Sequence, residues 1–335
     1  MDNSNCTEYQ GSAICPVCGC ADSQTLFCAT SWEAFARDRV YEIRCCDNCH
    51  VAFTSPAACP EVLNVFYAHG LYRVVRNRLH PVIEVLSRVF QWSRLRKITR
   101  VHQRGRLLDM GCGKGRFLAY AVSRGWDVYG VEPSENNFRV ACSKLGDRVV
   151  HNLDELDSIE KFDVVTLWHV LEHGPTPVQV LRQILPYLKA TGFIYVAVPN
   201  FASLQAWLGR GHWSHLDIPR HCVHYTPSTL KYTLALAGYK LLWVDYFSIE
   251  FNPIGVLQTA LNLLGCEPGL IYSLVKRNIS CDIVSGKLRF FYNVAMAVVG
   301  VPILILPAIL FACLESLIGR GGTFLICATP FTAGK

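Results

Sequence analysis

Three glycines at alternate positions, Gly111, Gly113 and Gly115, follow a short apolar run that contains Asp109. The residues after Gly115 begin a helical pattern, so this stretch predicts a strand, a tight turn and the start of a helix. Glycines in such a turn let a ligand lie against bare backbone, and the amides of the turn and of the helix N-terminus can hold its polar end. The stretch therefore predicts a nucleotide-binding loop.

The spacing of this loop discriminates between two nucleotide cofactors. A dinucleotide fingerprint has the pattern Gly-x-Gly-x-x-Gly, whereas this chain has Gly-x-Gly-x-Gly, with Asp109 two positions before the first glycine. The next apolar segment, 127–132, ends in Glu132, 17 positions after Gly115. There its carboxylate can accept hydrogen bonds from both hydroxyls of a ribose. Together these features favour S-adenosylmethionine over NAD.

Four cysteines form two Cys-x-x-Cys pairs, Cys15 with Cys18 and Cys46 with Cys49, separated by 27 residues. Four thiolates at this spacing are typical of a closed, tetrahedral, structural Zn2+ site, although unrelated free thiols and the use of Cys45 in place of Cys46 stay open. The first residues show neither a basic run nor an apolar signal stretch, so the 16 cysteines of the chain fit a reduced, cytoplasmic compartment.

Histidines are concentrated in residues 212–225, which we call the histidine-rich segment. Its two His-x-x-His pairs could hold a metal, but no helix places them and Pro219 interrupts the arrangement. Histidine is also the natural general base near neutral pH. Our first choice for a catalytic base is His221, followed by His215, His224 and His169; a role for these residues as hydrogen-bonded loop anchors stays open.

Alternating apolar and helical segments from residue 106 to residue 199 predict a doubly wound parallel sheet. The expected strands cover 107–109, 127–132, 147–150, 162–168 and 192–198, and a helix over 177–189 leads into a turn at 190–192. A helix over 226–237 and strands over 240–247 and 323–328 follow. Ligands of open sheets bind beyond the carboxyl ends of the strands, so Asp109, Glu132, Asn152 and Trp168 are expected at one edge.

These features resemble the class I S-adenosylmethionine-dependent methyltransferases, and more closely their small-molecule branch with an N-terminal zinc ribbon. The resemblance is carried by the glycine loop with Glu132 and by residues 162–173, 192–200 and 321–326, so it covers nearly the whole chain. It implies a Rossmann-like, mostly parallel seven-stranded sheet whose last strand is antiparallel. The implied cofactor contacts are Asp109 and the three glycines at the methionine end, Glu132 at the ribose, and Asn152 and Leu153 near the adenine, with Trp168 beside the cofactor.

The resemblance also bears on the acceptor side. In the family, a Trp…Pro-Arg-His loop similar to residues 213–221 covers the acceptor pocket. In ubiquinone-pathway O-methyltransferases the stretch after the fourth strand looks like Glu-x-x-Glu-His. Here Glu172 and His173 match that pattern, but its first position is His169, so the resemblance does not extend in full to the catalytic metal of those enzymes.

Residues 71–106 are strongly basic, with ten arginines or lysines and Glu84 as the one acidic residue. Apolar residues recur in this stretch at helical intervals and predict a basic amphipathic helix. Three interpretations stay open for its charge: a solvated face, attraction to an anionic membrane surface, and recognition of a phosphate-bearing substrate or RNA.

Residues 294–314 contain no charge, and their length alone makes them a transmembrane candidate. A single crossing would separate the last strand from its expected neighbour in the same sheet, and Pro302 and Pro307 interrupt a straight helix. We expect an in-plane or re-entrant membrane contact; a buried cap over the acceptor site and a true span are the alternatives.

The sequence thus predicts a zinc ribbon in residues 1–60, a basic helical segment in 61–104, an S-adenosylmethionine-binding core in 105–248, a hydrophobic helical insertion in 249–320, and a final strand with a tail in 321–335. The expected activity is O- or C-methylation of a small or lipid-linked acceptor, such as a sugar, polyprenyl or quinone-type metabolite, at the inner face of the membrane. The alternatives are RNA methylation, for which no Asn-Pro-Pro-Tyr motif is present, and a catalytically silent, membrane-bound scaffold.

Overall fold

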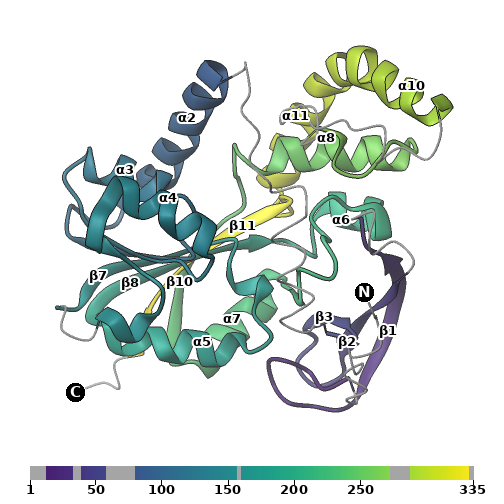
Figure 1. Cartoon of the computed structure of the whole chain (residues 1–335). Helices are drawn as coiled ribbons and strands as arrows, with labels where there is room; N and C mark the ends of the chain where they lie inside the picture. The colour runs from purple at the N-terminus through teal and green to yellow at the C-terminus, as the bar shows by residue number, and fades with distance from the viewer. Residues whose placement is uncertain (1–12, 33–38, 58–79, 157–159, 272–286, 332–335) are drawn as a thin grey trace, which may run out of the picture.

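The computed structural model describes residues 13–32, 39–57, 80–156, 160–271 and 287–331. They form a large seven-stranded sheet and a small four-stranded sheet, with helices on both faces of the large one (Figure 1). The parts of the predicted zinc ribbon, basic segment, core, hydrophobic insertion and tail that fall on residues 1–12, 33–38, 58–79, 157–159, 272–286 and 332–335 lie outside the described part of the chain.

The large sheet has the strand order β10-β11-β8-β7-β4-β5-β6. These strands are β10 (Tyr239–Asp245), β11 (Thr323–Pro330), β8 (Leu188–Pro199), β7 (Phe162–Trp168), β4 (Arg106–Met110), β5 (Asp127–Val131) and β6 (Val149–Val150). The five strands from β8 to β6 run parallel, whereas β11 is antiparallel to both of its neighbours. This arrangement confirms the predicted Rossmann-like fold with an antiparallel last strand.

Helices cover the two faces of this sheet in separate layers (Figure 1). The layer on one face contains α2 (His80–Thr99), α3 (Arg116–Val122) and α4 (Glu135–Leu145); the layer on the other contains α5 (Pro177–Ile184) and α7 (Pro227–Leu236). Successive residues of β4 show why both faces need cover, because Leu107 packs with Phe117 in one core and Leu108 packs with Leu181 in the other. Strands buried on both faces read as continuous apolar runs, as here.

The turn expected at residues 190–192 is wrong, because β8 already begins at Leu188. After α5 a single 3-10 turn, Leu185–Tyr187, brings the chain back to the sheet. The register between β7 and β8 shifts between Phe162 and Val164, which pairs Leu188 with Phe162 and Phe193 with Val164. Gly192 therefore lies inside an irregular strand, where its lack of a side chain is needed: a Cβ atom would meet Leu188 Cδ1 at 2.7 Å.

The small sheet is antiparallel and consists of β1 (Ser23–Thr30), β2 (Val40–Cys46), β3 (Ala52–Ser55) and β9 (Val223–His224). The last of these strands belongs to the histidine-rich segment. Its pairing with β3 joins the cysteine-bearing N-terminal strands to residues about 170 positions later. The sequence pattern did not predict this pairing.

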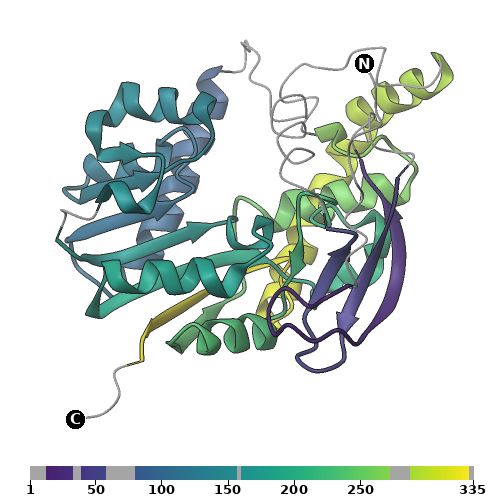
Figure 2. The same ribbon diagram turned by 60° about the horizontal axis from the view of Figure 1, so that its bottom comes forward.

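The insertion between β10 and β11 is helical. It contains α8 (Asn252–Leu263), α10 (Lys287–Ala295), a π-helical turn (Met296–Gly300) and α11 (Val301–Leu317). Leu257 and Leu261 of α8 pack against Ala308 of α11. Figure 2 shows the insertion standing beside the sheet and not over one of its faces. By length and composition alone, the helix Leu288–Leu317 could cross a membrane, which is weak evidence by itself.

Candidate active site

The glycine loop connects the end of β4 to the start of α3. Gly111, Gly113 and Gly115 have φ angles of 65°, 57° and 66°, in the left-handed region that favours glycine. A Cβ atom on Gly111 would lie 2.7 Å from Cγ2 of Val170, whereas a Cβ atom on Gly113 would meet nothing within 4 Å. The loop therefore presents bare backbone at Gly113, at the carboxyl edge of the parallel strands.

Glu132 follows β5 and reaches this loop directly. One carboxylate oxygen accepts a hydrogen bond of 2.7 Å from the amide of Gly113, and the other accepts one of 2.9 Å from the amide of Ser134. A carboxylate has about four lone-pair sites, so two remain for further donors. The two backbone amides thus fix a buried carboxylate that can still accept the hydroxyls of a ribose.

Asp109 lies on β4 behind the loop and is almost completely buried. Burial raises the pKa of its carboxyl group to about 7, opposed by a 2.6 Å hydrogen bond from Thr166 Oγ1 on β7 and by the positive charge of Arg94. A buried carboxyl group gains most from a cationic ligand, and S-adenosylmethionine carries a sulfonium and an ammonium group.

The other predicted cofactor residues lie along the same edge of the sheet. Asn152 and Leu153 line a cleft of about 690 Å³ together with Met110 and Val131. Trp168 ends β7, packs edge-on against Phe117, and has a buried indole N–H with no hydrogen-bond partner among the described residues. The bare backbone, the two buried carboxyl groups and this donor fit S-adenosylmethionine.

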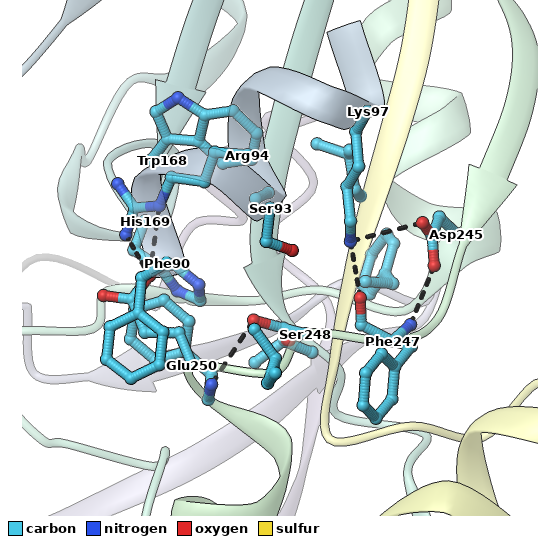
Figure 3. A pocket seen from close by; sticks show the side chains of 16 residues that line it. Phe90, Ser93, Arg94, Lys97, Trp168, His169, Asp245, Phe247, Ser248 and Glu250 are labelled. Carbon is cyan, nitrogen blue, oxygen red and sulfur yellow. Dashed lines mark hydrogen bonds and ion pairs between the residues drawn. The ribbon is translucent and has the colours of Figure 1, made fainter. Parts of the chain in front are cut away.

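A second pocket lies next to Trp168, between α2 and the first residues of the insertion. It is lined by Arg94 of α2, by Trp168 and His169 after β7, and by Glu250 and Phe251 before α8 (Figure 3). Its cavity of about 20 Å³ has room for about one water molecule.

Arg94 closes this pocket. Its guanidinium group lies 5.2 Å from the ring centre of Trp168 and 5.9 Å from that of Phe251, and it pairs with Glu250 at 2.6 Å. In the sequence, Arg94 is one of ten basic residues between 71 and 106, and no pattern singles out Glu250 or Phe251. Their meeting depends on the packing of α2 against the insertion, which no local pattern encodes.

His169 is the predicted catalytic histidine that lines this pocket. Its ring centre lies 4.0 Å from that of Phe251, and its Nδ1 lies 3.2 Å from Oε1 of Glu172. Burial and the charge of Arg94 lower the pKa of His169 to about 3, while burial raises the pKa of Glu172 to about 7. The imidazole is therefore neutral, and its Nδ1 is held by the carboxyl group of Glu172.

The chain also matches a known protein family. Residues 75–244 match the model of a family described as a methyltransferase domain. The chain belongs to this family. The predicted enzyme class, a class I S-adenosylmethionine-dependent methyltransferase, is thereby confirmed.

Named relatives of this methyltransferase align with its core. A ubiquinone biosynthesis O-methyltransferase of Rhodopseudomonas palustris is 29% identical over an alignment of 171 residues. This alignment covers 44% of this chain and 63% of that relative. The enzyme of the same name from Bradyrhizobium diazoefficiens is 31% identical over 180 residues, 46% of this chain and 68% of the relative. The chain thus spans a little under two thirds of the first relative. A solved S-adenosylmethionine-dependent methyltransferase from Archaeoglobus fulgidus aligns over 72% of this chain and 94% of its own, with 19% identity and a TM-score of 0.44.

The other predicted histidines of the methyltransferase lie behind the pocket. The ring of His215 lies 6.3 Å from that of Phe251, and burial lowers the pKa of His215 to about 4. The backbone oxygen of His215 accepts a 2.8 Å hydrogen bond from Nδ1 of His221. His221 is also buried, which keeps its pKa well below the usual value. Neither His215 nor His221 lines the pocket that contains His169.

His221 instead meets Glu172 and His173, and one ligand atom from each lies within 4.8 Å of the others. Nδ1 of His173 donates to the Arg220 carbonyl at 3.0 Å, which turns Nε2 toward the group. Oε2 of Glu172 is buried and has no hydrogen-bond partner in the described part of the chain. A carboxylate and two oriented imidazoles fit a divalent transition metal. The two His-x-x-His pairs do not form such a group among the described residues.

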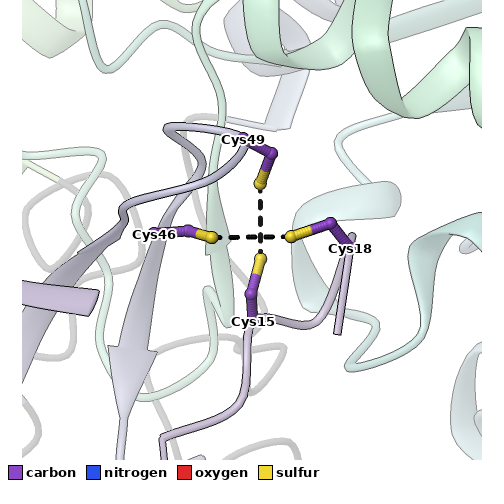
Figure 4. Close-up of side chains that lie close together, drawn as sticks. All are labelled: Cys15, Cys18, Cys46 and Cys49. Carbon is purple, nitrogen blue, oxygen red and sulfur yellow. Dashed lines mark hydrogen bonds between the residues drawn. The ribbon is translucent and has the colours of Figure 1, made fainter. Parts of the chain in front are cut away.

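The four predicted zinc ligands of the methyltransferase come together at one point (Figure 4). The Sγ atoms of Cys15 and Cys49, and those of Cys18 and Cys46, lie 3.5 Å apart, and all four lie within 4.8 Å of one another. A tetrahedral site with Zn–S bonds of about 2.3 Å places its sulfurs about 3.8 Å apart. The residues therefore fit Zn2+. Cys45 does not join them; its thiol is directed at the carbonyl of Cys46.

Proposed function

We propose that this methyltransferase moves the methyl group of S-adenosylmethionine to a hydroxyl group of a small, membrane-soluble acceptor of quinone or polyprenyl type. The observation that carries the proposal is the aromatic pocket around Trp168 at the end of β7, the strand that lies beside Asp109 on β4. This pocket holds about one water molecule, so the proposal requires Arg94 to move aside when the acceptor binds. Methyl transfer from a sulfonium is an in-line displacement, so catalysis depends on alignment and on the exclusion of water. The names of the aligned relatives support an O-methyl product.

His169 is the proposed general base. A hydroxyl acceptor must lose its proton, and an imidazole whose Nδ1 donates to Glu172 offers Nε2 as the proton acceptor. Because burial and Arg94 lower the pKa of His169 to about 3, its strength as a base depends on the ionised carboxylate of Glu172. His221, our first choice from the sequence, and His215 would then act from behind, by positioning Glu172 and His173. A divalent metal held by Glu172, His173 and His221 would lie behind His169 and would orient Glu172, whose other oxygen holds Nδ1 of His169.

Exposed apolar residues on the insertion support a membrane-soluble acceptor. Only 11% of the most apolar part of the helix Leu288–Leu317 is buried, so this is not a core helix. Its large, more than half exposed side chains are Leu288, Phe291, Val298, Val299, Ile303, Leu306, Leu310, Leu314 and Leu317. Single apolar side chains at a surface need no explanation, but a continuous run of this size is typical of contact with lipid or a partner.

The topology favours a contact that lies in the membrane plane. Asp245 at the end of β10 pairs with Leu325 near the start of β11, so the insertion leaves the sheet and returns to it at the same place. A helix that crosses the membrane once cannot return the chain to the same place. The 12 residues of α8 extend about 18 Å, which is too short for a second crossing of a hydrocarbon layer of about 30 Å.

Basic residues add an electrostatic attraction. α2 carries the exposed Arg88 and stands at the same end of the molecule as α10 (Figure 1). Apolar contact together with basic charge binds anionic membranes more firmly than either one alone. This arrangement supports placement at the inner, anionic face of the cytoplasmic membrane.

Transfer of a labelled methyl group tests the proposed substrate class. The purified protein, loaded with zinc, is incubated with methyl-labelled S-adenosylmethionine and, separately, a membrane lipid extract, a water-soluble extract and total RNA; a Glu132→Ala variant is the control. The proposal is supported if the wild type labels the lipid fraction and the Glu132→Ala variant does not. Label in RNA would favour the alternative activity, and label confined to the water-soluble fraction would exclude a membrane-soluble acceptor.

A further inference from the structure

The N-terminal strands hold the histidine-rich segment through a second sheet. We call residues 13–32 and 39–57, which contain the four cysteines and β1 to β3, the zinc-ribbon unit. Its last strand, β3, pairs with β9, so that Ala52 lies opposite His224 and Phe53 lies opposite Val223. β3 begins three residues after the ligand Cys49, and the amide of Cys46 donates to the carbonyl of Val51 in the turn between them. The position of the four cysteines is therefore tied to the start of β3.

Thr54 makes the most direct contact between the zinc-ribbon unit and the histidine-rich segment. Its hydroxyl group is buried and lies 2.8 Å from the carbonyl of His221 and 2.9 Å from Nε2 of His224. Its amide donates a 3.0 Å hydrogen bond to the carbonyl of Cys222. Thr54 thus contacts three residues of the histidine-rich segment, His221, Cys222 and His224.

On its other side, the histidine-rich segment contacts the loop after β7 that contains His169, Glu172 and His173. The amide of Cys222 donates a 2.8 Å hydrogen bond to the carbonyl of Glu172, and the Arg220 carbonyl accepts one from His173. A short path of hydrogen bonds thus runs from β3 through Cys222 to Glu172, whose carboxyl group holds His169. Each step is a direct contact, with no gap to be bridged by solvent.

Residues on both faces of β2 and β3 pack on the core, whereas β1, at the edge of the small sheet, is largely exposed. Cys46 and Phe53 share a buried cluster with Val223 and Tyr225, and residues on the opposite face of the sheet pack against the start of the histidine-rich segment. The members of this second cluster are Tyr41, Ile43, Ala52, Trp213, Leu216 and Ile218.

We propose that the zinc-ribbon unit is a positioning element of the acceptor site, which acts through Thr54 on the group Glu172, His173 and His221. This inference rests on the proposed function, since it assigns the group a role on the acceptor side. Loss of zinc should disturb these histidines and leave the cofactor site intact, because Asp109, the glycine loop and Glu132 make no contact with β3 in the hydrogen bonds that hold them.

The test compares histidine environments with cofactor binding in the full chain. Proteins with ¹⁵N-labelled histidine are prepared as wild type, Thr54→Val and Thr54→Ser; Thr25→Val, which removes an exposed threonine hydroxyl from the same unit, is the matched control. Side-chain spectra report the tautomers of His173, His221 and His224, and calorimetry with S-adenosylhomocysteine reports the cofactor site. Both measurements are repeated after zinc is removed with a chelator and restored.

We expect Thr54→Val and zinc removal to shift or broaden the His221 and His224 signals, with the affinity for S-adenosylhomocysteine unchanged within about twofold. Thr54→Ser and Thr25→Val should retain the wild-type spectrum. Unchanged His221 signals after zinc removal would overturn the inference, and so would a parallel loss of cofactor binding, which would make the unit a general stabiliser of the fold. Failure of the wild type to bind S-adenosylhomocysteine would contradict the proposed function instead, because the spectra report the coupling independently.

Discussion

Thr166 and Asp109 lie side by side on β7 and β4, and the threonine hydroxyl donates a 2.6 Å hydrogen bond to the buried carboxyl group. This contact supports the ionised form of Asp109, but burial outweighs it and raises the pKa to about 7. The cofactor site therefore contains an acid that changes its charge close to neutral pH.

The affinity for S-adenosylmethionine should depend on pH through Asp109. The ionised fraction of a group with a pKa of about 7 rises about tenfold between pH 6 and pH 8, and only the ionised form attracts a cationic ligand. The free energy of unfolding of the ligand-free protein should change in the opposite direction and fall as the pH rises. A carboxyl group whose pKa is raised on folding contributes its stability below a pH of about 4 and loses it as the pH rises through about 7.

Calorimetry over this pH range checks the prediction, with Asp109→Asn as the comparison. The ratio of wild-type to variant affinity removes the ligand's own titration, and this ratio should rise between pH 6 and pH 8. A constant ratio would exclude Asp109 as the titrating group.

Zinc binding should require Cys46 and not Cys45. Cys46 is completely buried and its sulfur lies 3.5 Å from that of Cys18, whereas the adjacent Cys45 is directed at a backbone carbonyl. Elemental analysis should find about one zinc ion per chain in the wild type and in Cys45→Ser, and almost none in Cys46→Ser. Equal zinc content in the two variants would contradict a four-cysteine site at these positions.

Membrane binding should depend on the exposed face of α11. Transfer of a leucine side chain from water to an apolar phase is worth about 2 kcal/mol, so Leu306→Asp should weaken binding to anionic vesicles by about 30-fold or more. Leu26→Asp changes a similarly exposed leucine on β1, far from the insertion in sequence, and should bind as the wild type does. Sedimentation with vesicles measures both, and equal binding by the two variants would argue for a protein partner on this helix.

Replacement of the proposed base should affect turnover and not cofactor binding. His169→Gln should lower kcat by about 10²- to 10⁴-fold, the usual contribution of a general base. His221→Gln should have a smaller effect, because His221 does not line the pocket, and His212→Gln, at a more exposed position of the same segment, is the control. A larger loss in His221→Gln than in His169→Gln would restore the order that the sequence suggested.

The sequence predicted the parts of this protein that are encoded locally. The glycine loop, the carboxylate after β5 and the two cysteine pairs each combine residue types at fixed short spacings, and the fold places their members in contact. The helix α7 begins one residue after the predicted Thr226, which forms a capping box with Thr229.

The parts that depend on distant contacts were missed. β9 has only two residues, and its partner β3 lies about 170 positions earlier. The strand is therefore too short for an alternation of apolar and polar residues to predict it. Arg94 and Glu250 are 156 positions apart, and only the packing of α2 beside the insertion makes them close the pocket. The turn expected at residues 190–192 failed for a related reason, because Gly192 serves an irregular strand pairing that is defined by β7.

The cofactor site is the foundation of the proposed activity, and one titration tests it most directly. Calorimetry with S-adenosylhomocysteine compares the wild type with Glu132→Ala and with Glu135→Ala, an exposed carboxylate three positions later that pairs with Arg139. Loss of a buried, charged hydrogen-bond acceptor costs about 1.5–3 kcal/mol. We therefore expect micromolar binding by the wild type and by Glu135→Ala, and affinity at least about tenfold lower in Glu132→Ala. Absence of binding by the wild type, or equal affinity in all three proteins, would contradict the assignment of the Glu132 site to S-adenosylmethionine.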